Sequence, residues 1–380
     1  MNNKFSIGDP VPNFYCASSN NKEFHFDTAA GRYIVLCFYG SASVAKTKGV
    51  IDFVSGEARH LFDDNRVCFF GVSVDRKDKD EGRAKQIIPG IRFFWDYSHK
   101  VSQLYAAMHD NSLNNGGMIR YRPFTLILDP NLRVVANIPL DDTEKHNARL
   151  VEVLEKLPPV EEYSGVPVRA PILTIPNVLE PELCQELIRL YEKHGGQETG
   201  TMVEEGGYTV GKLDTKFKSR ADCVVNDSKI VTSIKHRIFQ RIAPEIKKAF
   251  QFDVTAVERY IVACYDSENK GFFRPHRDNT TKGTAHRKFA CTINLNAGDY
   301  EGGELRFPEF GPQTYRAPTG GAIIFSCSLL HEATPVTSGK RYATLPFLYD
   351  QSGVELRRKN LEFLANSEDA VGKPTSLNIC

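Results

Sequence analysis

The residues in this sequence with the clearest capacity for chemistry are two histidines and an aspartate. His276 and Asp278 lie two positions apart in the segment RPHRDNTT, and His331 follows later in the chain. On an extended segment, side chains at positions i and i+2 point to the same side, so His276 and Asp278 can bind one metal ion. Two histidines and one carboxylate on one face of a metal leave three positions open, which suits non-haem Fe(II) with a bidentate cosubstrate and O₂. His-x-Asp alone is a weak pattern, and two polar residues on a surface turn are the alternative interpretation.

The segments around these residues have the pattern of short β-strands. From Val257 onward, apolar runs are broken by Gly, Asn and Pro, which is typical of a sandwich or jelly roll. In the segment Lys288–Asn296, one face of the expected strand carries Phe289, Cys291, Ile293 and Leu295, and the other carries Ala290, Thr292, Asn294 and Asn296. The second, more polar face points either to water or into a pocket inside a barrel.

A basic pair, Lys340 and Arg341, follows His331 across the turn Pro335–Gly339. From this place Arg341 could form a bidentate pair with the far carboxylate of a 2-oxo acid. Lys340 is its neighbour on the same expected strand and should therefore point to the opposite side.

Over Pro171–Asp350 the sequence resembles the Fe(II)/2-oxoglutarate-dependent dioxygenases of the prolyl 4-hydroxylase type. The likeness is carried, in order, by APILTIPNVLEPELCQELI, IVACYDSENKGFFRPHRDN, TINLNAGDYEGGELRFPE and HEATPVTSGKRYATLPFLY. The site residues that the resemblance implies are the iron ligands His276, Asp278 and His331, the 2-oxoglutarate anchor Arg341, and Tyr265 and Asn294 near the cosubstrate. For Tyr265 and Asn294, a structural role as hydrogen-bonded residues of the barrel is the alternative.

The resemblance implies hydroxylation of an unactivated C–H bond by an enzyme that requires Fe(II), with ascorbate as a further cofactor. The reaction consumes O₂ and 2-oxoglutarate and releases succinate and CO₂. We expect the substrate to be a prolyl residue or a free, proline-like cyclic amino acid. Basic residues gather before and around the expected site, at Lys212, Lys216, Lys218, Arg220, Arg274, Arg277 and Arg287. Such a cluster is usually a solvated face, but it also favours an anionic substrate, with Arg220 and Arg274 as the candidate substrate-binding residues.

The first 157 residues alternate short apolar runs with helix-like segments, which predicts an α/β fold. The expected strands are Arg32–Gly40, Arg66–Asp75, Ile91–Ser98, Pro123–Asp129 and Arg133–Leu140. The expected helices are Val50–Phe62, Glu81–Gln86, Lys100–Met108 and Thr143–Lys156. Most of the strands are nearly continuous apolar runs, as buried strands should be.

This region resembles a peroxiredoxin or another thioredoxin-fold redoxin, through GDPVPNFYCASSNNKEFHFDTAAGRYIVLCFYGSASVAKTKGVIDF and YRPFTLILDPNLRVV. Peroxiredoxins carry Pro-x-x-x-Thr-x-x-Cys after the first long strand, but the corresponding positions here are Gly40, Val44 and Thr47. A threonine hydroxyl has no thiolate-like state near pH 7, so we expect no peroxidase chemistry. We expect Cys37 to be a buried apolar residue, and Pro123 resembles the cis-proline of thioredoxin folds.

A proline-rich segment, Leu157–Pro171, lies between the two regions and should not form a helix. We therefore expect an α/β thioredoxin-like domain over residues 1–157, a linker over 158–171, and a double-stranded β-helix (jelly-roll) domain with supporting helices over 172–380. The second domain should contain helices at Leu179–Gly195 and Ser228–Phe250, because Glu180 and Glu182 favour a helix start and Gly195 a helix stop.

Composition argues against several other classes of protein. The net charge is +1, so overall electrostatics favour neither a nucleic-acid partner nor a membrane surface. No apolar run is long enough to span a membrane, and MNNKFSIGDPVPNF lacks the apolar core of a signal peptide. The nine cysteines are scattered and form no C-x-x-C pair, which suggests reduced thiols in a cytoplasmic protein.

Two other functions compete with a hydroxylase. In one, the chain is a thiol redox protein whose second half only binds a ligand, but the missing cysteine at position 47 argues against it. In the other, the chain is a scaffold with a degenerate dioxygenase fold, but the complete set of His276, Asp278, His331 and Arg341 argues against that. Redoxin folds commonly self-associate, so we also expect the first domain to act as a packing partner in a homodimer.

Overall fold

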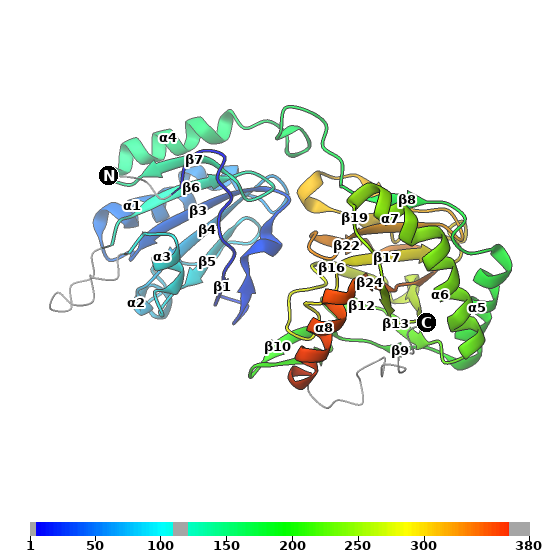
Figure 1. Ribbon diagram of the computed structural model, residues 1–380. Coiled ribbons are helices and arrows are strands. Elements are labelled where there is room, and N and C mark those ends of the chain that lie inside the picture. Colours follow the sequence, from blue (N-terminus) through cyan, green and yellow to red (C-terminus); the bar gives the residue numbers. More distant parts are fainter. Residues whose placement is uncertain (1–4, 109–120, 365–380) are drawn as a thin grey trace. The chain divides into compact units, whose positions relative to one another are not determined.

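The computed structural model describes residues 5–108 and 121–364, and its contacts divide the chain into two compact units (Figure 1). The first unit comprises Met1–Arg169 and Pro308–Pro312, and the second comprises Ala170–Phe307 and Gln313–Cys380. The proline-rich segment contains one short 3₁₀ helix, η4 (Val160–Glu162), where no helical turn was expected. Pro158 and Pro159 precede this turn, at positions where a helix needs no N–H donor, and Pro167 and Pro171 follow it.

The first unit is built on a five-stranded sheet with the strand order β5-β4-β3-β6-β7. The strands are β3 (Tyr33–Gly40), β4 (Val67–Ser73), β5 (Ile91–Trp95), β6 (Phe124–Leu128) and β7 (Val134–Pro139). β3, β4 and β5 are parallel, whereas β6 and β7 are antiparallel to their neighbours. β3 and β4 are buried along their whole length, which explains their nearly continuous apolar sequences.

Helices and a small hairpin complete this unit. They are α1 (Ala45–Ser55), α2 (Arg76–Asp80), α3 (Lys100–Leu104), α4 (Thr143–Glu155), the 3₁₀ helices η1 (Phe26–Ala29) and η2 (Glu57–Leu61), and the hairpin strands β1 (Tyr15–Cys16) and β2 (Phe24–His25). The predicted helix Val50–Phe62 is divided between α1 and η2 at Gly56, whose φ and ψ are −111° and −95°.

Two local predictions for this unit were wrong. The helix expected at Glu81–Gln86 is instead α2, which begins earlier because the Asp75 carboxylate accepts the Lys77 N–H and caps it. Pro123 does not follow a cis bond; the cis peptide among the described residues is Ile88–Pro89. A trans bond before Pro123 is the ordinary outcome where no contact imposes the other isomer.

The second unit contains two β-sheets that share an apolar interior, as in a jelly roll. The larger sheet follows the order β14-β24-β17-β23-β15-β13-β9 with β8, β18 and β21 attached, and the smaller one follows β12-β16-β22-β19-β20. Ala263, Tyr265 and Ala343 of the larger sheet pack with Phe273 and Ala333 of the smaller sheet. A separate hairpin is formed by β10 (Thr201–Glu205) and β11 (Tyr208–Lys212).

The strands of these two sheets are short, as the frequent turn residues predict. They are β8 (Leu173–Ile175), β9 (Gln197–Glu198), β12 (Lys218–Ser219), β13 (Ala221–Val224), β14 (Ala256–Glu258), β15 (Ile261–Asp266), β16 (Phe272–His276), β17 (Phe289–Asn294), β18 (Tyr300–Gly302), β19 (Leu305–Arg306), β20 (Thr314–Tyr315), β21 (Ala322–Ser326), β22 (His331–Ala333), β23 (Val336–Thr344) and β24 (Phe347–Tyr349).

Helices cover the outer face of the larger sheet (Figure 1). They are α5 (Pro181–His194), α6 (Ser228–Arg237), the π-helical turn η5 (Ile238–Ile242) and α7 (Ala243–Phe250). In the same unit α8 (Gln351–Asn360) and η8 (Leu361–Phe363) follow the last strand, and η6 (Ser267–Asn269) is a short 3₁₀ helix, whereas the 3₁₀ helix η7 (Pro308–Phe310) is assigned to the first unit. Leu187, Ile234 and Ile246 of these helices pack in one core with Cys291 and Ile293 of β17. The predicted apolar face of β17 therefore faces helices, and its other face is turned toward the smaller sheet.

The two predicted helices of this unit agree with the structure except near their ends. α5 begins at Pro181, where a proline fits the first helical turn, and it ends before Gly195, which has a φ of 73°. The helix expected at Ser228–Phe250 is α6, η5 and α7 in succession. No helix among the described residues has both the length and the apolar character needed to cross a lipid bilayer.

Candidate active site

His276, Asp278 and His331 lie together in the second unit, between its two sheets. His276 ends β16, His331 begins β22, and the two residues are paired directly across these strands. His276 Nε2 is 3.5 Å from Asp278 Oδ1, and His331 Nε2 is 3.3 Å from Asp278 Oδ2. One ligand atom from each of the three residues lies within 4.8 Å of the others, a spacing that suits a single metal ion.

Backbone carbonyls hold both imidazole rings in the orientation that a metal requires. His276 Nδ1 is 2.7 Å from the Arg274 carbonyl, and His331 Nδ1 is 3.0 Å from the Leu329 carbonyl. A proton on each Nδ1 donates to these carbonyls, which leaves each Nε2 as a lone-pair ligand. The His276 ring also stacks on Phe273, with centroids 3.5 Å apart, so its plane is fixed before any metal binds.

The ionisation of this group also fits a divalent cation. Burial lowers the pKa of His276 to about 4, and the neighbouring His331 acts in the same direction. Burial opposes ionisation of Asp278, but His331 and His276 reverse that effect and hold its pKa well below its usual value. A neutral His276 and an ionised Asp278 are the forms that bind metal, so these residues fit Fe(II).

The three residues line a cavity between the sheets together with a buried arginine, Arg341. The lining residues are Arg220, Arg259, Tyr265, Phe273, His276, Asp278, Ala290, Cys291, Thr292, Leu305, Phe325, His331, Ala333, Arg341, Leu345 and Phe347. Arg341 lies on β23 directly opposite Tyr265 of β15, and its guanidinium lies over the tyrosine ring, 5.0 Å from the ring centroid.

Arg341 is 2% exposed, and neither its Nε nor its Nη1 has a hydrogen-bond partner. Buried polar groups are almost always paired, so this orphaned cation indicates a missing anionic ligand. Gly303 leaves the room that the arginine occupies, since a Cβ there would lie 3.2 Å from Arg341 Cδ. A 2-oxo dicarboxylate whose far carboxylate met Arg341 would supply the missing acceptors.

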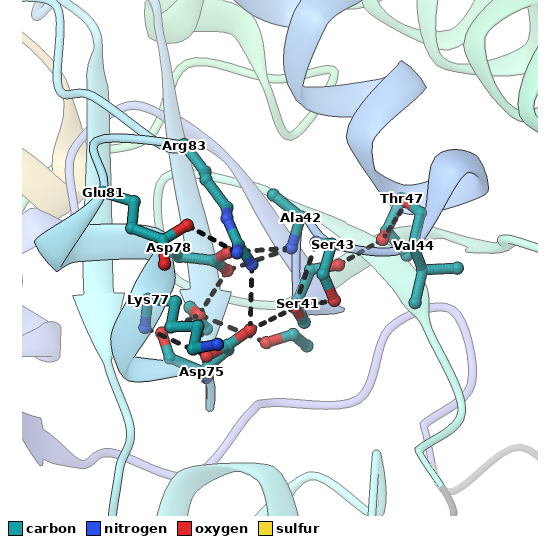
Figure 2. Close-up of polar contacts among 12 residues, drawn as sticks. Ser41, Ala42, Ser43, Val44, Thr47, Asp75, Lys77, Asp78, Glu81 and Arg83 are labelled. Atoms are coloured by element: carbon teal, nitrogen blue, oxygen red, sulfur yellow. Dashed lines mark hydrogen bonds and ion pairs between the residues drawn. The ribbon is translucent and has the colours of Figure 1, made fainter.

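The first unit contains a different kind of polar cluster, at the turn between β3 and α1 (Figure 2). The Asp78 carboxylate accepts the Ala42 N–H, at 3.1 and 3.0 Å, and the Ser73 hydroxyl, at 2.7 Å. Ser41 Oγ donates to Asp75 at 2.7 Å. Thr47 lies in the first turn of α1, and its hydroxyl donates to the Ser41 and Val44 carbonyls.

The cysteine nearest to this turn in sequence is buried in the sheet. Cys37 lies on β3, is fully buried, and has its pKa raised to about 12 by that burial. Thr47 itself is only 3% exposed. The turn therefore holds a satisfied hydroxyl at the position where a peroxiredoxin would carry a thiolate.

Comparisons with known proteins agree with this division. The model of the 2OG-Fe(II) oxygenase superfamily matches residues 260–349, and that of the AhpC/TSA family matches residues 7–137. The first domain of the chain thus matches the AhpC/TSA family, and the second matches the 2OG-Fe(II) oxygenase superfamily. The predicted families, folds and enzyme class are thereby confirmed: the chain is a 2-oxoglutarate-dependent oxidoreductase with a thioredoxin-like domain and a jelly-roll domain.

Individual relatives cover one domain each. A PKHD-type hydroxylase of Cupriavidus metallidurans is 26% identical over 197 residues, which are 48% of this chain and 79% of that protein. A solved prolyl hydroxylase of Trichoplax adhaerens, in complex with a hypoxia inducible factor peptide fragment, has a TM-score of 0.38 and 16% identity, covering 49% of this chain and 86% of that one. The solved peroxidoxin BcpB of Mycobacterium tuberculosis has a TM-score of 0.33 and 18% identity, and the match covers 40% of this chain and 99% of that one.

The other predicted residues of the oxygenase domain differ in their relation to the cavity. Tyr265 lines it, but Asn294 does not: its side-chain N–H donates to the Ala317 carbonyl at 2.7 Å, and its Oδ1 is buried without a partner. Lys340 points away, as its place next to Arg341 predicts, and pairs with Asp266 at 2.9 Å.

The two candidate substrate residues do not both reach the cavity. Arg220 lines it but is already neutralised, since its Nε and Nη2 donate to Asp222 at 2.7 and 2.6 Å. Arg274 is exposed, and it is not among the cavity-lining residues. It neighbours Phe273, which faces the cavity, so alternation turns Arg274 outward, and a role for Arg274 in binding substrate stays a prediction.

Sequence reasoning missed two residues of the oxygenase domain. Tyr300 has a buried hydroxyl without a partner, and the nearby Arg341 cation partly offsets the rise in its pKa that burial causes. Its place just before the Gly302–Gly303 turn, in a segment that carries the family likeness, could have drawn attention to it. Arg259 lines the cavity, which Tyr300 does not, and nothing in the pattern around Arg259 distinguishes it from a surface arginine.

Proposed function

We propose that the oxygenase domain hydroxylates an unactivated C–H bond, with Fe(II) held by His276, Asp278 and His331. One observation carries this proposal: three metal-binding side chains share a cavity with the buried, unpartnered guanidinium of Arg341. A metal site alone would be compatible with many functions. A metal site with an orphaned cation at a fixed place in the same cavity is what a dicarboxylate cosubstrate requires.

The proposed reaction converts 2-oxoglutarate, O₂ and R–H into succinate, CO₂ and R–OH, so that one oxygen atom enters succinate and the other enters the product. Bound Fe(II) supplies the activation of O₂ for this chemistry. Arg341 binds the far carboxylate of 2-oxoglutarate, and Tyr265 lies against that guanidinium and keeps it in place. The apolar walls, among them Phe325, Leu345 and Phe347, exclude water from the reacting groups.

For the substrate we propose a prolyl residue or a free cyclic amino acid that resembles proline. The support is the likeness to prolyl hydroxylases over Pro171–Asp350 and the hydroxylase names of the relatives that match this region. In this proposal Arg220 lines the space that the substrate occupies, and its charge is already neutralised by Asp222. We also propose that the substrate is anionic, because arginines line the cavity.

Three further proposals concern the protein as a whole. We expect ascorbate to sustain repeated turnover, and we expect the protein to work in the cytoplasm, since the eight cysteines of the described residues are all free thiols. We also propose that the AhpC/TSA domain mediates a homodimer, which light scattering of the full chain and of a variant lacking residues 1–160 would test. A thiol redox function instead predicts consumption of hydrogen peroxide, which we expect to stay at the level of a protein-free control.

The test of the proposed function is succinate release by the full chain with Fe(II) and 2-oxoglutarate, across a panel of free amino acids and proline-rich peptides. Hydroxylated product should appear in equal amount with succinate for the true substrate. Arg189→Gln, which removes an exposed arginine of α5, serves as a matched control for arginine variants. Absence of 2-oxoglutarate-dependent succinate release with every compound, and absence of Fe(II) binding, would contradict the proposal.

A further inference from the structure

Three arginines line the cavity of the oxygenase domain, and they differ in whether their charge is matched. Arg220 forms a bidentate pair with Asp222, and both side chains are almost completely buried. Arg341 and Arg259 form no ion pair with any residue in the described part of the chain. The proposed function uses Arg341 for 2-oxoglutarate, so one uncompensated cation in the cavity has no assigned partner.

Arg259 is held in place at the cavity wall by contacts that leave its charge unneutralised. Its Nε and Nη2 both donate to the Leu345 carbonyl, at 3.1 and 3.0 Å, and its guanidinium lies 4.5 Å from the centre of the Phe347 ring. A guanidinium has five N–H donors, so a single carbonyl leaves it capacity for a bidentate carboxylate. Its backbone φ is 69°, a conformation that is uncommon for a side chain of this size.

The carboxylate next to it in sequence is not available to neutralise it. Glu258 is engaged by Arg287 at 2.7 Å, by His286 at 3.0 Å and by Arg357 at 3.2 Å. Burial, together with the nearby cations Arg220 and Arg287, lowers the pKa of Arg259 to about 10, so it still carries its proton near pH 7. An unpaired cation inside a cavity is costly unless a ligand anion completes it.

The two uncompensated arginines lie toward opposite ends of the same pair of strands. Arg341 is paired with Tyr265, near the end of β15, whereas Arg259 precedes the start of β15 and contacts Leu345, beyond the end of β23. The side chains that line the cavity near Arg259 are apolar, namely Ala290, Leu345 and Phe347. One end of the cavity therefore offers a cation for the cosubstrate, and the other offers a cation beside an apolar wall.

We propose that Arg259 binds the carboxylate of the substrate, so that the substrate is a free, proline-like amino acid and not a prolyl residue inside a peptide chain. This inference rests on the proposed function and narrows its substrate class. A free amino acid presents a carboxylate for Arg259 and an aliphatic ring for the wall of Ala290, Leu345 and Phe347. A prolyl residue within a chain has an uncharged amide in place of that carboxylate, and it would leave the arginine unpaired.

The experiment compares L-proline, L-prolinamide and a proline-rich peptide as probes with the wild-type full chain. Succinate release and hydroxylated product are measured at saturating 2-oxoglutarate, and binding of each probe to the Mn(II)-loaded protein is measured by calorimetry. We expect L-proline to stimulate turnover and to bind, and we expect L-prolinamide to bind at least about tenfold more weakly, since it lacks the charged acceptor. This comparison needs no variant, so a folding defect cannot obscure it.

Variants then locate the effect. Arg259→Gln should raise the KM for L-proline at least about tenfold and leave the KM for 2-oxoglutarate unchanged, while Arg259→Lys should recover part of the loss. Arg189→Gln, the exposed control on α5, should change neither constant. Far-ultraviolet circular dichroism and the thermal midpoint verify that each variant is folded.

Several outcomes would overturn the inference. Equal binding of L-proline and L-prolinamide would do so, as would stimulation by the peptide alone, and in the latter case the proposed function would stand. An Arg259→Gln variant with an unchanged KM for L-proline would also do so. If the protein slowly consumed 2-oxoglutarate but none of the three probes raised that rate, the proline-like substrate class would be refuted. If it consumed no 2-oxoglutarate at all, the proposed function itself would be refuted.

Discussion

The turn before α1 in the AhpC/TSA domain and the cavity of the oxygenase domain both gather polar side chains, but their hydrogen bonding differs. In the turn, the Asp78 carboxylate and the Thr47 hydroxyl are bound by groups of the same domain. In the cavity, Arg341 is buried with two N–H groups unpartnered. A cluster with a structural role can satisfy its own polar groups, whereas a site that binds a ligand has to leave some of them for the ligand.

The difference has consequences for energy as well as for function. Removing the Asp78 carboxylate would leave the buried Ala42 N–H without an acceptor, which destabilises the fold. Removing the guanidinium of Arg341 takes away no hydrogen bond of its Nε or Nη1, so the fold loses little while ligand binding loses much. The comparison thus predicts that activity and stability respond to different substitutions in the two domains.

The largest expected effect is on the metal ligands. His276→Ala or His331→Ala should reduce succinate release to the level of a metal-free control, because two side chains cannot hold the metal in the required geometry. Fe(II) affinity, measured by calorimetry under anaerobic conditions, should fall in both variants, while the thermal midpoint stays close to that of the wild type. Full activity in either variant would remove that residue from the proposed site.

Arg341→Ala should give the next largest effect. Loss of a charge-assisted bidentate pair costs about 1.5–3 kcal/mol, so the KM for 2-oxoglutarate should rise about ten- to a hundredfold. The KM for the hydroxylated substrate should change much less, and Arg341→Lys should recover part of the loss. If the 2-oxoglutarate requirement were unchanged, the orphaned guanidinium would not be the cosubstrate anchor, and the contrast between the two domains would fail.

Asp78→Ala tests the other half of the comparison. It leaves the Ala42 N–H without its acceptor and removes the shortest hydrogen bond of the Ser73 hydroxyl, and we expect a loss of about 1–3 kcal/mol in the free energy of unfolding of the AhpC/TSA domain. Urea unfolding of the full chain, followed by the fluorescence of Trp95 in that domain, measures this loss. Asp78→Asn, which keeps one acceptor, should lose less, and turnover of 2-oxoglutarate should not change.

The smallest effect is expected at a partly exposed ion pair in the same domain. Arg92 donates to Asp64 at 2.5 and 2.9 Å and, despite partial burial, holds the pKa of Asp64 at about 2. Because this pKa is depressed in the folded state, the stabilisation is present above about pH 4 and is lost as the pH falls toward 2. Asp64→Asn should therefore destabilise the domain slightly near pH 7 and not at all near pH 2, as measured by thermal unfolding. If Asp64→Asn lowered the free energy of unfolding as much as Asp78→Ala, the difference in burial between Asp64 and Asp78 would not determine how much each carboxylate stabilises the domain.

Features that depend on local rules and on residue spacing could be predicted from the sequence. Continuous apolar runs located the strands of the first sheet, and period-two alternation separated the helix-facing side of β17 from its other side. The same alternation correctly sent Lys340 away from Arg341. The sequence alone also shows that position 47 is not a cysteine, because this depends on residue identity and not on folding.

Other features were decided by strand register, which no local pattern encodes. A shift between Phe273 and His276 along β16 lets both face the cavity although they are three positions apart, and it leaves Arg274 outside. Helix capping by Asp75 likewise moved α2 away from the expected segment Glu81–Gln86.

Which arginine keeps an uncompensated charge depends on the folded arrangement of the second unit. In sequence, Arg220 looked like a cation available to substrate and Arg259 looked unremarkable. Folding placed Asp222 on the same side of a strand as Arg220 and committed Glu258 to Arg287, His286 and Arg357, which left Arg259 without a carboxylate. The sequence specifies the charges, but their pairing depends on side-chain direction and on contacts between distant segments, and these exist only once the sheets have formed.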